Sequence, residues 1–400
     1  RAANELDSEF LTSTDRWFRP VQTRTGPDGG LWVVDMYRYV IEHPKWIPDE
    51  TLAEIDVFAG QGKGRIYRVV PTAKDPQSQP TLSELNDQEL AKAIDTDNGI
   101  TRDLVHQMLL WRDAKDTRDE LLRIAQTSQN PAVRIQALAA LDGLKQLSRE
   151  AILLAVTDLH PDVRRHAVRM SESSLTDPKV SAAVLKLAND PSFEVRMQVA
   201  YSIAFIESDN VTKPLTRLAT ESTDPYLQSA ALSSLTPSNV GPVAEQILAT
   251  EKSRELVGPE VVATTAGMGS AAAIESALNR ILESSDEWQW WQLESLAQFL
   301  DGLDRRAASG ALGIGKATDR NQQPAQVQIK ITPRQTQAAR SIFLAARERI
   351  LDPSVTDSQA AMALKLLGRR LGPVSQSLLS PAPNQARSEP SQEITSEIAK

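Results

Sequence analysis

Hydrophobic and polar residues follow two different periods along this chain. Up to residue 70, short apolar runs follow glycine turns: LWVVD at 31–35 comes after GPDGG at 26–30, and RIYRVV at 65–70 comes after GQGKG at 60–64. Such runs between turn signals predict β-strands. Because two strands do not form a stable domain alone, we expect them to be the last strands of a larger β-structure whose earlier strands precede Arg1.

From Thr81 onward, apolar positions recur with the 3.6-residue period of amphipathic helices, and the sequence repeats itself. The motif NPAVR at 130–134 returns as HPDVR at 160–164 and, with extra residues, as DPSFEVR at 190–196. A degenerate fourth copy starts at Asp224, so the prolines are 30, 30 and 34 residues apart. In each copy we expect an Asp or Asn to cap a helix that Pro opens, with the Val facing the core.

Helix pairs of this kind cannot bury their apolar side alone, so the copies must stack on one another. The predicted fold class is therefore mainly α: a HEAT-like, armadillo-like helical solenoid with a short N-terminal β segment. An earlier copy without proline starts at Asn98, and the amphipathic segments 288–303 and 334–351 predict later helices. Thr356 can cap a further helix over 357–367.

Composition shifts suggest the domain boundaries. The β segment occupies residues 1–71, a polar and proline-containing linker 72–80, and HEAT-like repeats 81–310. A Gly- and Gln-rich loop or insertion is expected at 311–331, followed by further repeats at 332–400 that stop inside a helix which Glu389-Pro390 would open. With Arg1 in place of an initiator Met, this predicts a fragment of a longer protein or a processed product.

The overall composition narrows the possible chemistry. The net charge of −8 gives no reason to expect nucleic acid as a partner. The chain has no cysteine, which excludes disulfides, thiolate nucleophiles, Cys-ligated zinc and covalently attached haem within these residues. No apolar run reaches the ~18 residues that a transmembrane helix needs. We expect no cofactor and no metal in this chain.

The densest polar and aromatic group lies in the β segment and comprises Arg19, Asp35, Tyr37, Arg38 and His43. Loops between strands can gather groups that bind substrate or cofactor, and His43 is a candidate general base. The alternative is structural: Asp35 and Arg38 brace the turn that leaves a strand, while Tyr37 and Trp46 cover the sheet edge. A lone His before Pro with no orienting carboxylate is more often structural, so no catalytic residue is assigned.

The other motifs have ordinary structural interpretations. The glycine-rich segment 60–64 lacks the Gly-Lys-Ser/Thr ending of a phosphate loop and leads into a strand, so it predicts a hairpin loop. His106 is isolated, and His160 and His166 lie six positions apart on different helix faces, so no metal site is expected.

Two further groups leave alternatives open. The recurring Arg134, Arg164 and Arg196 either form a basic ladder for an acidic partner or, as we favour, each brace the neighbouring repeat through an Asp or a carbonyl. Trp288, Trp290 and Trp291 cannot all lie on one face of the helix we expect there. They therefore mark either a contact surface or a packed helix junction.

Several motifs carry a resemblance to a known family: FLTSTDRWFRPV at 10–21, GPDG at 26–29, LWVVDMYR at 31–38, IEHP at 41–44 and GRIYRVVP at 64–71, with PDVRRHAVR at 161–169. They resemble the large haem-binding "membrane-bound dehydrogenase"-like proteins of Planctomycetes and their relatives. The resemblance implies that residues 1–71 are the incomplete C-terminal blade of a β-propeller similar to sugar dehydrogenases. It also implies a c-type cytochrome domain beyond this chain, which would hold haem c, and a periplasmic or otherwise exported location.

Three functional hypotheses follow. In the first, the chain is a non-catalytic HEAT-repeat scaffold that links its own propeller and cytochrome domains in a larger dehydrogenase. In the second, it is an autonomous scaffold that binds other proteins on the solenoid surface. In the third, it resembles the HEAT-repeat bilin lyases, which leaves the motifs between residues 10 and 70 unexplained.

Overall fold

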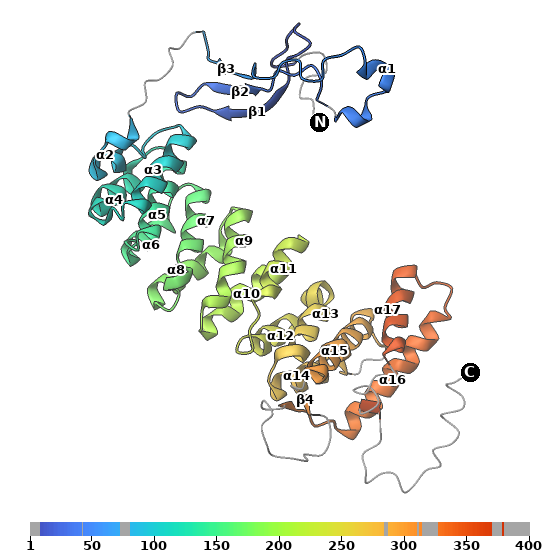
Figure 1. The fold of residues 1–400 in the computed structure, drawn as a ribbon. Helices are drawn as coiled ribbons and strands as arrows, with labels where there is room; N and C mark the ends of the chain where they lie inside the picture. Colours follow the sequence, from blue (N-terminus) through green and yellow to red (C-terminus); the bar gives the residue numbers. More distant parts are fainter. Residues whose placement is uncertain are drawn as a thin grey trace, which may run out of the picture. The chain divides into compact units, whose positions relative to one another are not determined.

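The computed structural model describes residues 9–41, 43–72, 81–283, 287–309, 312–313, 327–369 and 378–379. The chain forms two compact units, residues 1–148 and 149–400. It is a mainly α, HEAT-like helical solenoid that carries a short three-stranded sheet near its N-terminus (Figure 1). The predicted fold class is confirmed.

The sheet contains one strand more than the sequence predicts. Strands β1 (Pro20–Thr25), β2 (Leu31–Asp35) and β3 (Arg65–Val69) pair antiparallel in that order. The two predicted strands are confirmed as β2 and β3. We did not predict β1, because its sequence PVQTRT has no apolar run and all six of its residues are exposed. The predicted loop at 60–64 leads into β3 and contains two glycines with positive φ, Gly60 and Gly62.

This sheet has almost no core of its own. Among the described residues up to 72, Val33 is the one buried hydrophobic side chain. Four of the five residues of β3 are exposed as well. Between β2 and β3 the chain forms a 3₁₀ turn, η1 (Pro44–Trp46), and a single helical turn, α1 (Asp49–Leu52). A sheet that buries so little apolar area is marginal by itself.

The rest of the first unit is helical, with α2 (Asp87–Lys92), α3 (Gly99–Trp111), α4 (Arg118–Thr127) and α5 (Pro131–Gly143). The predicted copy without proline is confirmed, because the Asn98 side chain accepts hydrogen bonds from the backbone N–H groups of Ile100 and Thr101 at the start of α3. The Asn98 amide also donates to the carbonyls of Gly26 and Pro27, at 2.9 and 3.1 Å. One residue thus joins the β1–β2 turn to the first helices.

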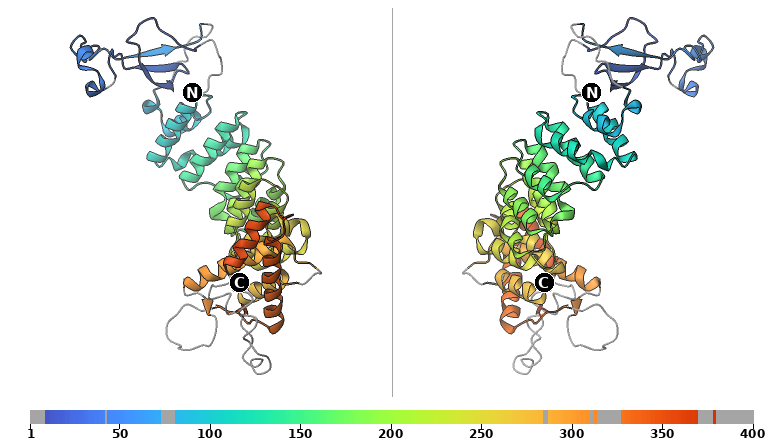
Figure 2. Two further views of the ribbon diagram at one scale, coloured as in Figure 1. Left: turned by 90° about the vertical axis from the view of Figure 1, so that its right-hand side faces the viewer. Right: turned by 90° about the vertical axis from the view of Figure 1, so that its left-hand side faces the viewer.

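The second unit stacks its helices in two layers (Figures 1 and 2). In one layer α7 packs on α9, α9 on α11, α13 on α15 and α15 on α17; in the other α6 packs on α8, α10 on α12 and α12 on α14. The bounds are α6 Arg149–Ala155, α7 Pro161–Met170, α8 Pro178–Lys186, α9 Phe193–Ser202, α10 Thr212–Thr220, α11 Pro225–Ser233, α12 Val240–Ala249, α13 Glu251–Met268, α14 Ala271–Ile281, α15 Trp290–Ala308, α16 Pro333–Ile350 and α17 Asp357–Gly368.

The repeat motif opens helices as predicted at Pro131, Pro161 and Pro225. Two details of the prediction are wrong. Helix α9 starts at Phe193 and is capped by Ser192, because the extra residues of this copy place Pro191 before the cap. Helix α7 is capped by His160, whose Nδ1 accepts from the Asp162 N–H at 3.3 Å and so replaces an Asp or Asn oxygen.

The core positions of the motif are confirmed, since Val133, Val163 and Val195 are each at most 1% exposed. The predicted cap at Thr356 is also confirmed: it forms a capping box with Gln359 at the start of α17.

The segment 311–331, predicted to be an irregular loop, contains two short strands, β4 (Leu312–Gly313) and β5 (Val327–Gln328), which pair in parallel. The repeat opening predicted near residue 389 and most of the linker predicted at 72–80 lie outside the described residues. Within the described part of the chain, no helix combines the length and the apolar character needed to cross a membrane.

Candidate functional site

Asp35 is the buried member of the predicted polar group in the β segment. Its side chain is buried at the end of β2, with the residue 1% exposed. One carboxylate oxygen accepts the backbone N–H groups of Arg19 and Tyr37, at 2.8 and 2.9 Å. The other lies 3.6 Å from Nε of Arg65. Asp35 therefore ties the entry of β1 to the exit of β2 and faces the first residue of β3.

Tyr37 is held in an unusual backbone conformation beside Asp35, with φ at 48°. The Arg65 guanidinium lies over its ring at 3.6 Å from the centroid, and the Trp17 ring is 5.7 Å away. Gly60 lies so close that a Cβ there would come within 2.2 Å of the Tyr37 carbonyl oxygen. The pKa of Asp15 is lowered by the Trp17 N–H and, after it, by the Tyr37 hydroxyl. Tyr37 is thus the centre of an aromatic and charged cluster.

The other members of the predicted group contact separate loops. The Arg19 guanidinium donates to the carbonyls of Arg16 and Phe18. Arg38 donates to the Phe58 carbonyl at 3.2 Å, and His43 Nδ1 accepts from the Lys45 N–H at the start of η1. The structure thus brings together Asp35, Tyr37 and the Arg19 backbone, but not Arg38 and His43. These contacts fit the bracing interpretation, and a catalytic role for any of the five stays a prediction.

The recurring arginines are used inside the repeats. Arg134, Arg164 and Arg196 each donate through Nη1 to backbone carbonyls five and six residues earlier, in the loop before their own helix. Arg164 also forms a bidentate ion pair with Asp190, with both N–O distances at 2.7 Å. The predicted bracing of the neighbouring repeat is therefore confirmed for Arg164, through Asp190, whereas the carbonyl contacts of Arg134 and Arg196 given above lie in the loop before their own helix.

The three tryptophans are covered at a helix junction. The helix α15 starts at Trp290, so Trp288 precedes it; our expectation of one helix containing all three is wrong, because Gln289 caps the helix. Trp288 donates to the Ser341 hydroxyl of α16 at 3.1 Å, while Trp290 and Trp291 face Arg349 and Arg254. The packed-junction alternative describes this site.

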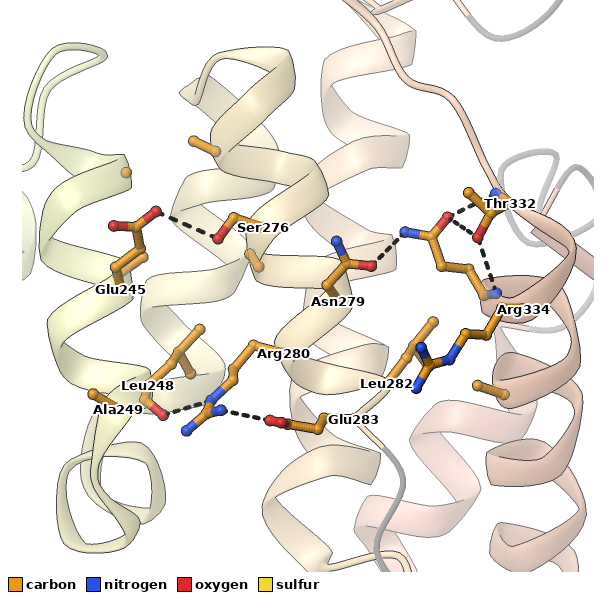
Figure 3. A pocket seen from close by; sticks show the side chains of 16 residues that line it. Glu245, Leu248, Ala249, Ser276, Asn279, Arg280, Leu282, Glu283, Thr332 and Arg334 are labelled. Atoms are coloured by element: carbon orange, nitrogen blue, oxygen red, sulfur yellow. Dashed lines mark hydrogen bonds and ion pairs between the residues drawn. The ribbon is translucent and has the colours of Figure 1, made fainter.

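A groove on the second unit was not predicted from the sequence. It has a volume of about 690 Å³ and lies along α14, between α12 and the start of α16 (Figure 3). We call it the α14 groove. Small and polar side chains share its wall: Gly241, Ala244, Glu245, Leu248, Ala249, Ala273, Ser276, Ala277, Asn279, Arg280, Leu282, Glu283, Thr332, Arg334, Gln335 and Ala338.

Part of the polar wall of the α14 groove is already bonded. Asn279 Oδ1 accepts from the Gln335 amide at 2.8 Å, which bridges α14 and α16 (Figure 3). Arg280 donates to the Leu248 carbonyl and pairs with Glu283. Within the described part of the chain, Arg334 has no ion-pair partner and the Asn279 NH₂ group has no acceptor. One sequence signal for this groove was missed: α12, α14 and α16 carry small residues on the sides that face the groove.

A second groove of about 650 Å³ lies beside α8. Its wall includes Leu175, Pro178, Leu185 and Ile206, together with Lys186 and Glu207. It is separate from the α14 groove and shares none of its lining residues.

The histidines of the helical array are dispersed. His160 caps α7, and His106 and His166 are half-buried with neighbours Gln136 and Arg165. Burial lowers the pKa of His106 and of His166 below the ordinary value, and nearby Arg165 lowers that of His166 further. In the part of the chain that the structure describes, no three His, Asp or Glu side chains are grouped as metal ligands.

Comparisons with known proteins define the class of the helical part. Residues 148–236 match the family of HEAT repeats, and residues 1–73 match a domain of unknown function (DUF7133). The stacked helix pairs make the second unit a helical repeat solenoid, and the HEAT match covers its first part, up to residue 236.

A solved structure, the designed armadillo repeat protein YIII(Dq)4CqI, is 12% identical with a TM-score of 0.23, and the match covers 71% of this chain and 99% of that one. No curated protein sequence matches the chain.

Proposed function

We propose that this chain is a non-catalytic HEAT-repeat scaffold that binds other proteins on its solenoid surface. The α14 groove is the observation that carries the proposal. The charged side chains of the repeat motif, such as Arg164 and Asp190, are used inside the stack. Those of the α14 groove, in contrast, leave Arg334 and the Asn279 NH₂ group available at the surface. Repeat solenoids commonly use such extended surfaces for binding.

The finer form of the proposal is that the array links domains of a larger, exported dehydrogenase-like protein, between a β-propeller and a c-type cytochrome domain. The small hydrophobic core of the N-terminal sheet supports this finer proposal. Propeller blades are four-stranded and pack on neighbouring blades, and the three strands here bury one hydrophobic side chain between them. Additional strands and sheets would cover the residues that β1 and β3 expose.

In this proposal Asp35, Tyr37 and Arg38 hold the loops of the blade in place. The buried Asp35 carboxylate accepts backbone N–H groups just before β1 and just after β2. Arg38 donates to a backbone carbonyl in the loop before β3. An autonomous scaffold, with no propeller attached, is the alternative.

Lysine crosslinking of the full-length natural protein tests the linking function. The coding sequence on both sides of this segment is determined first, and the whole protein is then purified and crosslinked. Lysines of the second unit, such as Lys179, Lys213 and Lys252, are expected to crosslink to domains on both sides of the array. If flanking domains exist and receive no crosslinks from the array, the linking function is wrong; if none exist, the autonomous scaffold replaces it.

A further inference from the structure

Two charges of opposite sign face the α14 groove from its two sides. Glu245 stands on α12 and Arg334 on α16, with α14 between them (Figure 3). The Glu245 carboxylate has a single long contact, from the Ser276 hydroxyl at 3.4 Å. Arg334 has no carboxylate partner among the described residues. Both residues are exposed, so each can pair with a charge that enters the groove.

The middle of the groove is electrically balanced. Arg280 and Glu283 pair with each other, and Arg280 is further held by the Leu248 carbonyl at 3.1 Å. Their charges offset one another locally. The field therefore runs across the groove, from Glu245 on α12 over α14 to Arg334 on α16, and a ligand with one charge of each sign that crosses α14 fits it in one direction only.

The floor of the groove suits a polypeptide backbone. Ala273, Ala277 and Ala338 carry only methyl groups, which allow a main chain to approach closely. Between them, Asn279 presents an NH₂ group that can donate to a peptide carbonyl, because its oxygen is already bonded to Gln335. A side-chain amide with one fixed bond is oriented in advance and loses little freedom when it binds.

We infer that the α14 groove binds an extended peptide segment with a basic residue at one end, which pairs with Glu245, and an acidic residue at the other, which pairs with Arg334. This rests on the proposed scaffold function and specifies its partner. Neighbouring helices lie roughly 8–10 Å apart, so crossing from α12 to α16 spans roughly 16–20 Å. At about 3.3 Å per residue, the two charged residues are about five or six positions apart.

The test uses a randomised nine-residue peptide display library selected on the full chain, followed by fluorescence anisotropy with the enriched peptides. The expected result is enrichment of Lys or Arg and of Asp or Glu about five or six positions apart, in a single order along the peptide. Binding should weaken as the salt concentration rises, because both ion pairs are exposed.

Charge reversal on the protein gives the sharper outcome. Glu245→Lys and Arg334→Glu are each expected to weaken binding about fivefold. The double variant E245K/R334E should instead prefer the peptide with its two charges exchanged. The matched control is Arg305→Glu, an exposed arginine of α15 outside the groove, which should leave binding unchanged. Circular dichroism checks that every variant remains folded.

Two results would overturn the inference. One is a selection without any charge motif, and the other is a selected peptide that binds wild type and E245K/R334E equally. In the second case the peptide binds elsewhere on the solenoid, so the scaffold function stands while the assignment to this groove fails. The finer linking function is tested separately, by the crosslinking of the full-length protein, and a chain from which no peptide at all can be selected would contradict the scaffold function itself.

Discussion

At the residue scale, the arginines that recur in the repeat motif contact backbone carbonyls, and one of them also forms an ion pair. Each of the three copies donates to carbonyls of the loop before its helix, and Arg164 also forms a bidentate pair with Asp190, one repeat further on. The side chains of this pair are 12% and 3% exposed. Asp190 also accepts the Ser192 N–H at 2.9 Å, so its carboxylate organises the loop that leads into α9. Removing one partner of a largely buried pair costs much more than removing one partner of an exposed pair, because the remaining charge is left uncompensated.

Replacing Asp190 by Asn should therefore lower the free energy of unfolding by about 2 kcal/mol, because Arg164 keeps its charge and loses its partner. Urea denaturation of the full chain, followed by circular dichroism, measures the change. The matched control is Glu221→Gln, which removes the exposed pair with Arg217 and should change stability by less than about 0.5 kcal/mol. Equal losses in the two variants would contradict this account.

The same pair gives the protein a pH dependence on the acid side. Burial raises the pKa of Asp190, but the hydrogen bonds from Arg164 and from the Ser192 N–H outweigh burial and hold this pKa below its ordinary value. A carboxyl group whose pKa is lower in the folded state stabilises the fold fully above its unfolded pKa of about 3.9. This contribution is lost as the pH falls through the folded pKa.

The stability difference between wild type and Asp190→Asn should accordingly stay constant from neutral pH down to about pH 4 and shrink below it. Urea unfolding of both proteins at a series of pH values checks this. A difference that grows as the pH falls would reverse the assigned direction of the pKa.

At the element scale, the packing of α13 against α15 depends on a glycine. Gly302 of α15 lies against α13, where an added Cβ would come within 2.4 Å of the Ala263 carbonyl oxygen and 2.8 Å of the Ala266 Cβ. The nearest atom belongs to the backbone, which cannot turn aside as a side chain can. The two longest helices of this layer therefore meet at a distance that only a glycine permits.

Gly302→Ala should destabilise the protein by about 1–3 kcal/mol, because it forces α13 and α15 apart. Gly267→Ala, at an exposed helical position where a Cβ meets nothing within 4 Å, is the matched control. It should be neutral or stabilise the protein by up to about 1 kcal/mol, since Ala restricts the unfolded chain more than Gly. Thermal unfolding of both variants measures the effects, and a neutral Gly302→Ala would show that the helices are not in backbone contact.

At this scale, helix starts could be predicted from the sequence where the signals are local. The starts of α3, α5, α7, α11 and α17 follow from cap and proline preferences that act within one turn of helix. The start of α9 shifted by two residues, because two candidate caps, Asp190 and Ser192, lie next to the same proline. Strand β1 was missed since its residues form no apolar pattern, and its pairing with β2 defines it instead.

At the scale of the whole molecule, the N-terminal sheet and the helical array differ in how many apolar side chains they bury. Helices such as α13 and α15 bury continuous runs of apolar residues, whereas the sheet buries Val33. Large side chains such as Phe10, Trp46 and Phe58 are more than 60% exposed around it. A segment with so few buried contacts opens at a small free-energy cost.

For this chain in isolation, limited proteolysis should cut first between residues 9 and 72, and amides of β1 and β3 should exchange hydrogen within seconds to minutes, well before those of α13 and α15. Mass spectrometry of the fragments and of the exchanged peptides measures both. The full-length protein supplies the comparison: slower exchange of the same strands there would show that other domains cover them. A protease-resistant N-terminal segment in the isolated chain would contradict the idea that the sheet is incomplete.

The sequence by itself determined the class of the fold, the repeat period and the starts of α3, α5, α7, α11 and α17, because these depend on residues within a few positions of one another. The tertiary structure alone decided which arginine meets Asp190, what covers the three tryptophans, and where a groove opens. Asn279 and Gln335 show the reason: they form one wall of the α14 groove although 56 positions separate them. Contacts across such a distance depend on how the intervening helices stack, and no local preference of either residue specifies that.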